Sequence, residues 1–207
     1  VALIERHTFP RRKVCGECIA ASNLALLDAL GVGASFAERA GGELRRVALM
    51  RGVETIVAPL PAAAGAHRFG RALGREHLDT LLVDAAEAAG ATRWQPWSLQ
   101  TIAGGAGAFV LRLRDEETVD AGEGVARAAE VELRAAVVVA AHGSWQPLPS
   151  ERAARRQARG AGDLFAFKAN FRGATLAADL LPVLSFAGGY GGMVVADGGV
   201  LTLAGCV

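Results

Sequence analysis

Apolar residues along the chain change between strand-like and helical spacing. Residues 1–4 form an unbroken apolar run that ends at Glu5, which is typical of a short strand buried on both faces of a parallel sheet. Helical spacing follows over residues 20–30 and, most clearly, over residues 75–89, where glycines mark the expected ends. Further apolar runs predict strands over residues 43–50, 53–60, 109–114, 131–134 and 137–141.

The connecting segments complete this pattern. Arg51-Gly52 predicts a hairpin, and residues 61–67 predict an exposed loop. We expect an acidic turn region over residues 115–124 and a basic helix over residues 150–159. The last 45 residues, which begin at Asp163, are typical of antiparallel strands and turns.

This order of elements predicts an α/β fold class, α+β overall. Parallel-type elements are interrupted by a hairpin, resume, and then give way to antiparallel strands. We assign an incomplete nucleotide-binding, Rossmann-like domain to residues 1–42 and 74–160. An incomplete antiparallel β-sheet domain is assigned to residues 43–73 and 161–207.

The composition of the chain argues against several classes of binding partner. The 22 basic and 21 acidic residues give a net charge of +1, so we expect neither nucleic acid nor an anionic membrane surface as a partner. The longest apolar region, residues 180–196, is broken by four glycines and a proline, so stable membrane insertion is not expected. With no visible signal peptide, a cytoplasmic location is expected.

Glu5 is the first residue with candidate chemistry. In dinucleotide-binding folds an acidic residue at the end of the second strand binds the ribose hydroxyls of the adenosine half. The glycine-rich turn that binds the pyrophosphate should then lie roughly 20 residues upstream, before Val1. The run Gly104-Gly105-Ala106-Gly107 does not replace it, because a strand rather than a helix follows.

The residues around Glu5 resemble a family of flavoproteins. The pattern E-R-x-x-F-P-R-x-K-x-C-G-E is similar to that of the family of geranylgeranyl reductases, flavin-dependent halogenases and para-hydroxybenzoate hydroxylase-like monooxygenases. The matching residues are Glu5, Arg6, Phe9, Pro10, Arg11, Lys13, Cys15, Gly16 and Glu17. The resemblance implies that Glu5 binds the FAD ribose, with Arg6 nearby, and that Cys15-Gly16 passes close to the flavin. A glycine suits that place, because backbone that approaches a planar ring leaves no room for a Cβ.

Later segments extend the resemblance. Residues 74–79 are similar to the family's G-R-x-x-L-D helix start, which implies that Arg75 reaches the cofactor. Leu99, from the strand after that helix, is a further candidate for cofactor binding. Residues 137–143 are similar to a strand that ends in G-A-D-G, with His142 in the place of the Asp.

Two C-terminal segments resemble the substrate-domain strands of the family. The segment FAFKANFRG contains Lys168, and GGYGGMVV occupies the place of a Y-x-W-x-F-P motif. Tyr190 matches the Tyr, whereas Gly192 replaces the Trp, so the wall of the pocket is altered and a prenyl-chain substrate is not assumed. His142, Lys168 and Tyr190 are candidates for a catalytic role, and no acid or base is assigned.

The resemblance implies an FAD-dependent oxidoreductase that is truncated at both ends. The N-terminal G-x-G-x-x-G and the later G-D motif are not in the chain. NAD(P)H is the expected reductant and a small hydrophobic molecule the expected substrate, in a monooxygenase or a reductase reaction. The sequence does not indicate an oligomeric state.

Two other classes of function stay open. Cys15-Gly16-Glu17-Cys18 is a C-x-x-C that precedes a helix, as in thiol-redox proteins. Alternatively, the protein is a flavoprotein-like scaffold that has lost its cofactor. A zinc site is not predicted, because a second pair of ligands is missing.

Overall fold

A computed structural model describes residues 1–117, 129–143, 160 and 162–207 of the chain. The chain divides into two compact units, and each is built from two separate stretches of sequence. The first unit contains Val1–Thr8 and Ala89–Ala161, and the second contains Phe9–Ala88 and Gly162–Val207. These boundaries differ from the domain boundaries assigned above, which divide the chain by expected function and stay a prediction.

The first unit contains the parallel strand pair that the N-terminal sequence predicts. Strand β1 (Ala2–Ile4) pairs in parallel with β6 (Thr92–Trp94). Full burial of β1 on both faces was the wrong expectation, because Ala2 is exposed and the next two side chains are half-buried. Among the described residues β6 is the one strand that pairs with β1. A three-stranded antiparallel sheet completes the unit: β7 (Trp97–Ala103), β8 (Phe109–Asp115) and β9 (Glu130–Ala135).

The strand predicted over residues 137–141 does not form. This stretch has no regular secondary structure, and its Val137 and Val139 side chains are 74% and 83% exposed. An isolated strand has no neighbour to accept its backbone hydrogen bonds, and none of the described residues provides one. The basic helix expected over residues 150–159 and most of the acidic turn region lie outside the described residues.

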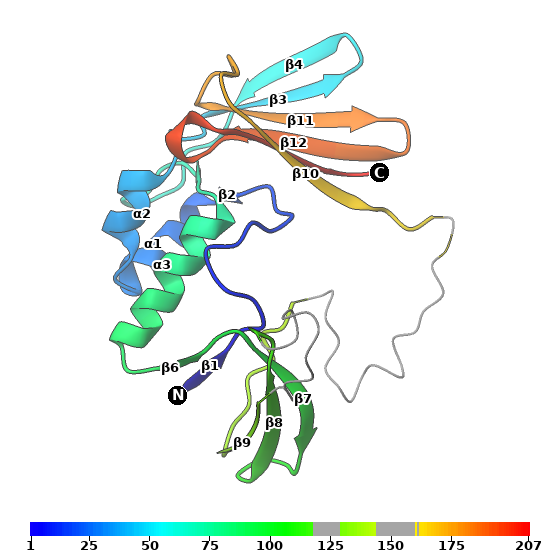
Figure 1. Cartoon of the computed structure of the whole chain (residues 1–207). Coiled ribbons are helices and arrows are strands. Elements are labelled where there is room, and N and C mark those ends of the chain that lie inside the picture. The colour runs from blue at the N-terminus through cyan, green and yellow to red at the C-terminus, as the bar shows by residue number, and fades with distance from the viewer. Residues whose placement is uncertain (118–128, 144–159, 161) are drawn as a thin grey trace. The chain divides into compact units, whose positions relative to one another are not determined.

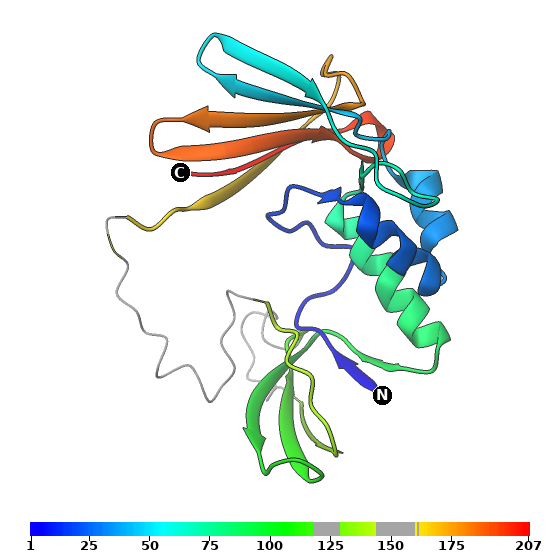
Figure 2. The ribbon, with the colours of Figure 1, turned by 180° about the vertical axis from the view of Figure 1, so that it is seen from behind.

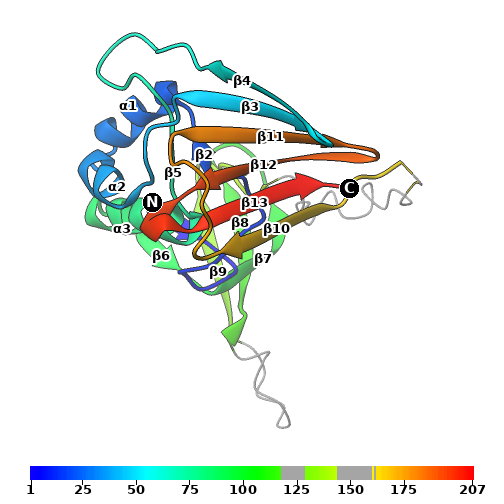
Figure 3. The ribbon, with the colours of Figure 1, turned by 90° about the horizontal axis from the view of Figure 1, so that it is seen from above.

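A six-stranded sheet forms the larger part of the second unit. Its strand order is β10-β13-β12-β11-β3-β4, which Figure 3 shows from above. All neighbours are antiparallel except β11 and β3, which pair in parallel. Gly52, with φ of 59°, turns the chain between β3 and β4, as the predicted hairpin requires. The strands are β3 (Arg46–Arg51), β4 (Glu54–Pro59), β10 (Ala166–Phe171), β11 (Leu180–Phe186), β12 (Gly189–Val195) and β13 (Leu201–Cys206).

Three helices lie on one side of this sheet (Figure 1). Helices α1 (Ala21–Ala29) and α3 (Arg75–Ala88) agree with the predicted spacing, whereas the short α2 (Gly33–Arg39) was not predicted. Helix α2 buries only Phe36, so its seven residues carry too little periodicity to be recognised. The helices pack around a buried cluster of Leu24, Leu27, Val32, Phe36 and Leu73.

Within the second unit, the segment of residues 9–20 lies on the same side of the sheet as the helices (Figure 2). It contains β2 (Cys18–Ile19), which pairs antiparallel with β5 (Arg71–Ala72), just before α3. A second buried cluster, formed by Leu44, Ala72, Val194 and Ala196, joins β5 to the sheet. No helix in the described part of the chain is long and apolar enough to cross a membrane.

The helical cluster gives a direct test of the second unit's core. Leu24 and Leu26 lie on the same helix, but Leu24 is 3% exposed and Leu26 is 60% exposed. We expect Leu24→Ala to lower the free energy of unfolding by about 3 kcal/mol, because it removes buried methyl groups and leaves a cavity. Leu26→Ala should change it by less than about 0.5 kcal/mol. Urea denaturation measures both, and equal effects would contradict this packing.

Candidate functional site

Glu17 is a buried acid at a strained turn of the second unit. Its residue is 3% exposed, and its φ of 59° makes it the one non-glycine residue with positive φ among those described. A left-handed backbone is unfavourable for a residue with a Cβ, and it persists only where the surroundings fix it. Two backbone contacts do so: the Glu17 N–H donates to Cys15 Sγ at 3.4 Å, and its carbonyl accepts the Leu73 N–H at 3.2 Å.

The Glu17 carboxylate joins three elements that are far apart in sequence. Its Oε1 forms an ion pair with Lys168 Nζ of β10 and accepts the backbone N–H of Arg75 at 3.3 Å, where α3 begins. Its Oε2 accepts the Thr202 hydroxyl of β13 at 2.5 Å. Thr202 in turn accepts a hydrogen bond from Asn170 Nδ2 at 2.7 Å. A buried charge requires this degree of pairing, since an unpaired one would carry a large desolvation cost.

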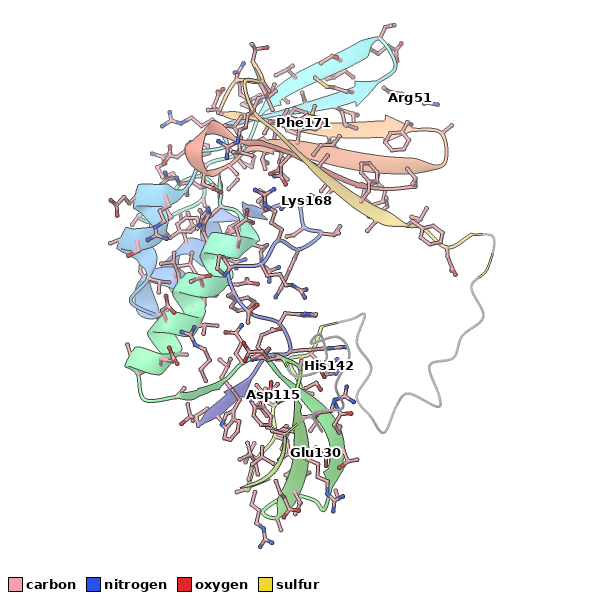
Figure 4. The ribbon with its side chains drawn as sticks, viewed as in Figure 1. Arg51, Asp115, Glu130, His142, Lys168 and Phe171 are labelled. Atoms are coloured by element: carbon pink, nitrogen blue, oxygen red, sulfur yellow. The ribbon has the colours of Figure 1, made fainter. Side chains whose placement is uncertain are left out.

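Lys168 comes from the edge strand β10 and lies on the side of the sheet that faces residues 9–20 (Figure 4). Its side chain is 6% exposed and that of Glu17 is 1% exposed. Both members of this ion pair are therefore removed from water. Of the three candidates for a catalytic role, Lys168 is the one that the structure brings together with Cys15-Gly16-Glu17, the C-G-E segment.

A second ion cluster involves the first turn of α3. The Arg75 guanidinium binds both oxygens of Asp79, with Nε–Oδ1 and Nη2–Oδ2 distances of 2.7 and 3.0 Å. Lys13 Nζ lies 2.7 Å from Asp79 Oδ2. Burial acts to raise the pKa of the Asp79 carboxyl, but the hydrogen bonds from Arg75 and Lys13 outweigh it and hold that pKa below its usual value.

Arg75 also contacts the C-G-E segment through Cys15. Its hydrogen bonds to Asp79 raise the pKa of the Arg75 guanidinium, partial burial opposes them, and a further hydrogen bond to the Cys15 thiol adds to the rise. Gly16, between Cys15 and Glu17, is exposed, and a Cβ built on it meets no atom within 4 Å. The backbone of Gly16 therefore faces open space between two fixed neighbours.

The other predicted cofactor-binding residues belong to the first unit. Glu5 follows β1 directly, and its Oε1 accepts the His7 N–H at 3.0 Å. Arg6 is exposed and lies 3.6 Å from a Glu116 carboxylate oxygen. Leu99 is half-buried in β7, at the irregularity in its pairing with β8. Their contact with FAD stays a prediction.

His142 and Tyr190 lie outside the Glu17 cluster. His142 is half-buried, and its Nδ1 has no hydrogen-bond partner among the described residues. Tyr190 is 57% exposed on β12 and lies opposite Cys206 of β13, and a hydrogen bond between the two side chains raises the pKa of the Tyr190 hydroxyl. Their catalytic roles stay predictions.

The sequence did not identify five polar members of these clusters as site residues. Glu17 and Lys13 belong to the motif of residues 5–17, and Asp79 is the last residue of G-R-x-x-L-D, but the motifs assign no role to these three residues. Thr202 and Asn170 carry no local signal, because Thr202 reaches Glu17, and Asn170 reaches Thr202, only after the sheet has formed. The missed residues are Lys13, Glu17, Asp79, Asn170 and Thr202.

The C-x-x-C cysteines do not have the geometry of a dithiol at a helix start. Cys15 and Cys18 are free thiols, and Cys18 lies in β2 rather than in the first turn of α1. Partial burial, with the neighbouring Cys15 thiol, raises the pKa of Cys18. A helix N-terminus would lower it instead. In the described part of the chain no three His, Cys, Asp or Glu side chains gather as metal ligands.

The fold is shared with solved flavoprotein structures. It is similar to the FAD-dependent chondrochloren halogenase of a myxobacterium (TM-score 0.73, 16% identity), over 100% of this chain and 46% of the halogenase. It is also similar to p-nitrophenol 4-monooxygenase from Pseudomonas putida (0.70, 12%), over 97% of this chain and 50% of that one. A geranylgeranyl bacteriochlorophyll reductase-like protein from Thermoplasma acidophilum matches over 99% of this chain and 49% of its own (0.68, 19%).

These similarities define the class of fold. No protein-family model and no curated protein sequence matches the chain. The chain spans about half the length of the three solved structures. Its fold is that of the FAD-dependent halogenases, monooxygenases and reductase-like flavoproteins, with the Rossmann-like part only partly present. The predicted fold class and the resemblance read from residues 5–17 are confirmed at the level of fold.

The Asp79 cluster predicts a pH-dependent stability. Above about pH 4, the usual pKa of an unfolded Asp, the paired carboxylate should stabilise the fold fully. Its folded pKa is lower, so the stabilisation is lost as the pH falls through that lower value. We expect Asp79→Asn to lower the free energy of unfolding by about 2 kcal/mol at pH 7, because it removes charge-assisted hydrogen bonds to the partly exposed Arg75 and Lys13, and by progressively less towards pH 2.

Denaturant unfolding at several pH values measures this difference. Asp179→Asn is the matched control, because it removes a carboxylate that also binds an Arg side chain bidentately but is exposed on the surface. The control should have a much smaller effect. A difference between wild type and Asp79→Asn that does not change with pH would contradict the assigned pairing.

Proposed function

We propose that the protein is an FAD-dependent oxidoreductase, an NAD(P)H-driven monooxygenase or reductase that acts on a small hydrophobic molecule. One observation carries the proposal. The Cys15-Gly16 segment, which the resemblance places close to the flavin, is followed by Glu17, and Glu17 joins it to α3 and to the sheet of a fold shared with FAD-dependent enzymes.

The residues fit an FAD group. Gly16 is exposed and a Cβ built on it meets no atom within 4 Å, so its backbone is accessible to a planar ring that a larger side chain would obstruct. Glu5 follows a strand in a parallel pair, and none of the described residues binds its Oε2. A carboxylate at the end of such a strand suits the ribose hydroxyls.

When bound, FAD supplies the electron transfer, and the protein supplies position, electrostatics and exclusion of water. Glu5 would hold the ribose hydroxyls, with Arg6 nearby. Gly16 would face the ring, with Cys15 beside it. The guanidinium of Arg75 is held by Asp79, so Arg75 would act from a fixed position at the start of α3.

One face of the six-stranded sheet suits a hydrophobic substrate. The strand register places a single row of residues across all six strands, so these residues share one face. The apolar end of the row is open to solvent, because Val183, Leu49 and Ile56 are 36%, 50% and 68% exposed. Ala204 and Gly192, in the middle of the row, have small side chains that protrude little from the sheet. From edge to edge the row is Lys168, Ala204, Gly192, Val183, Leu49 and Ile56.

The remaining parts of the proposal follow from the resemblance. We propose NAD(P)H as the reductant and the cytoplasm as the location, with no nucleic-acid partner. The near-neutral charge of the chain supports the absence of a nucleic-acid partner.

FAD reconstitution and oxygen consumption test this function. The purified full-length protein, incubated with FAD, should become yellow with the absorbance of a bound flavin. NADPH or NADH should then drive oxygen consumption that an aromatic or polyketide substrate accelerates, whereas a reductase would oxidise the nicotinamide without consuming oxygen in proportion. A colourless protein that cannot be reconstituted contradicts the proposal and favours the scaffold alternative.

Gly16 gives a residue-level prediction for the cofactor site. We expect Gly16→Val to weaken FAD binding at least tenfold, about 1.4 kcal/mol, because the side chain fills the space proposed for the ring. Flavin fluorescence titration measures this affinity. Gly105→Val is the matched control, because Gly105 also has no atom within 4 Å of an added Cβ. Equal affinity of the Gly16 variant and wild type would contradict a ring beside Gly16.

Cys18 separates the flavin proposal from thiol-redox chemistry. If the flavin performs the reaction, Cys18→Ser should keep the oxygen consumption or reductase rate within about twofold of wild type, since the thiol of Cys18 has a raised pKa and little thiolate at neutral pH. Loss of activity with normal FAD content would instead support an essential dithiol.

A further inference from the structure

The turn at Gly16, proposed to lie against the flavin, has little local structure to fix its position. Residues 9–17 contain no regular secondary structure, so no helix or strand ladder fixes the turn at Gly16. Gly16 itself touches nothing within 4 Å of the position of a Cβ. The position of its backbone must therefore come from its neighbours.

Glu17 is the neighbour with the most contacts to the rest of the unit. Its carboxylate binds Lys168, the Thr202 hydroxyl and the Arg75 N–H, and its own N–H binds Cys15 Sγ. Its positive φ sets the direction of the turn immediately after Gly16. These contacts hold the turn from two sides, the sheet and the start of α3.

A buried ion pair adds little to the stability of a fold, but it can fix the orientation of the side chains that form it. Apolar residues of similar size could fill the same volume without the cost of removing two charges from water. Apolar contacts have no direction, however, whereas the hydrogen bonds around Glu17 fix the orientation of its side chain and the turn that precedes it. Glu17 and Lys168 lie 151 residues apart in the sequence, so their contact joins two segments that only the folded chain brings together.

We propose that Lys168 and Glu17 are positioning residues that clamp the Cys15-Gly16 backbone to the sheet. The clamp fixes the surface against which the flavin ring would rest, and in this respect it depends on the proposed function. Lys168 also begins the row of residues that runs across the sheet face proposed for substrate. The clamp therefore fixes the position of the turn at Gly16 relative to the sheet face proposed for substrate.

Labelling of Cys15 tests the clamp without any cofactor. In a Cys18→Ser/Cys206→Ser background, a disulfide reagent such as DTNB reports how often the turn opens. Glu17→Gln and Lys168→Met should each raise the Cys15 labelling rate by about tenfold, because each removes a charge-assisted contact. Thr202→Val, which removes one hydrogen bond and no charge, should raise it about threefold.

Two controls separate positioning from a general loss of stability. Cys206 lies on β13 of the same sheet, and its labelling rate in a Cys15→Ser/Cys18→Ser background should stay within about twofold of its parent in every variant. Asp179→Asn removes a surface partner of Arg46 on the same sheet and should change neither rate. A parallel rise at Cys15 and Cys206 would overturn the proposal, because it would report loosening of the whole unit.

The flavin provides the second measurement. In the protein with intact cysteines, Glu17→Gln and Lys168→Met should weaken FAD binding about fivefold and change the visible circular dichroism of the bound flavin. An unchanged Cys15 labelling rate in both charge variants overturns the clamp, whatever the flavin spectrum does. A protein that binds no FAD contradicts the proposed function alone, since Cys15 labelling still decides whether the clamp exists.

If the single variants do not fold, Glu17→Gln combined with Lys168→Met removes both charges together and should give the same labelling result.

Discussion

The second unit depends on the pairing of one buried negative charge. The Glu17 carboxylate lies in an interior where an unpaired charge is not tolerated, so the residues around it must supply donors. They come from β10, from β13 and from the start of α3. Because each of these elements must be in place at once, satisfying one charge fixes the loop before α1, the third helix and the sheet relative to one another. The neighbouring Asp79 cluster repeats the principle on a smaller scale along α3.

The elements with strong local patterns could be predicted from the sequence. Helix α3 follows the spacing of its apolar residues, and the β3–β4 hairpin follows Arg51-Gly52. The fold class also followed, because residues 5–17 carry a motif whose residues lie close together in the chain. The prediction was wrong where a segment needs a distant partner. Residues 137–141 have the composition of a buried strand, but composition provides no neighbouring strand for its hydrogen bonds.

The site was less predictable than the fold for a physical reason. Arg75 and Cys15 could be named because they belong to short motifs, although their contact with each other could not. Lys168 is a candidate because of the segment it lies in, but nothing in its local sequence indicates that it pairs with Glu17. Thr202 lies 185 residues from Glu17 along the chain and reads as an ordinary strand residue. Strand register decides which side chains share a face, and a single sequence does not contain the register.

The parallel contact between β3 and β11 also has a consequence for synthesis of the chain. The β3–β4 hairpin is complete at residue 59, but the strand that covers the other edge of β3 begins at Leu180. At the usual speed of translation, the roughly 120 intervening residues take on the order of 6 to 24 s to make. During that interval β3 presents an open edge beside the apolar side chains of Leu49 and Ile56. The β3–β4 hairpin is therefore open to pairing with other strands until β11 has been made.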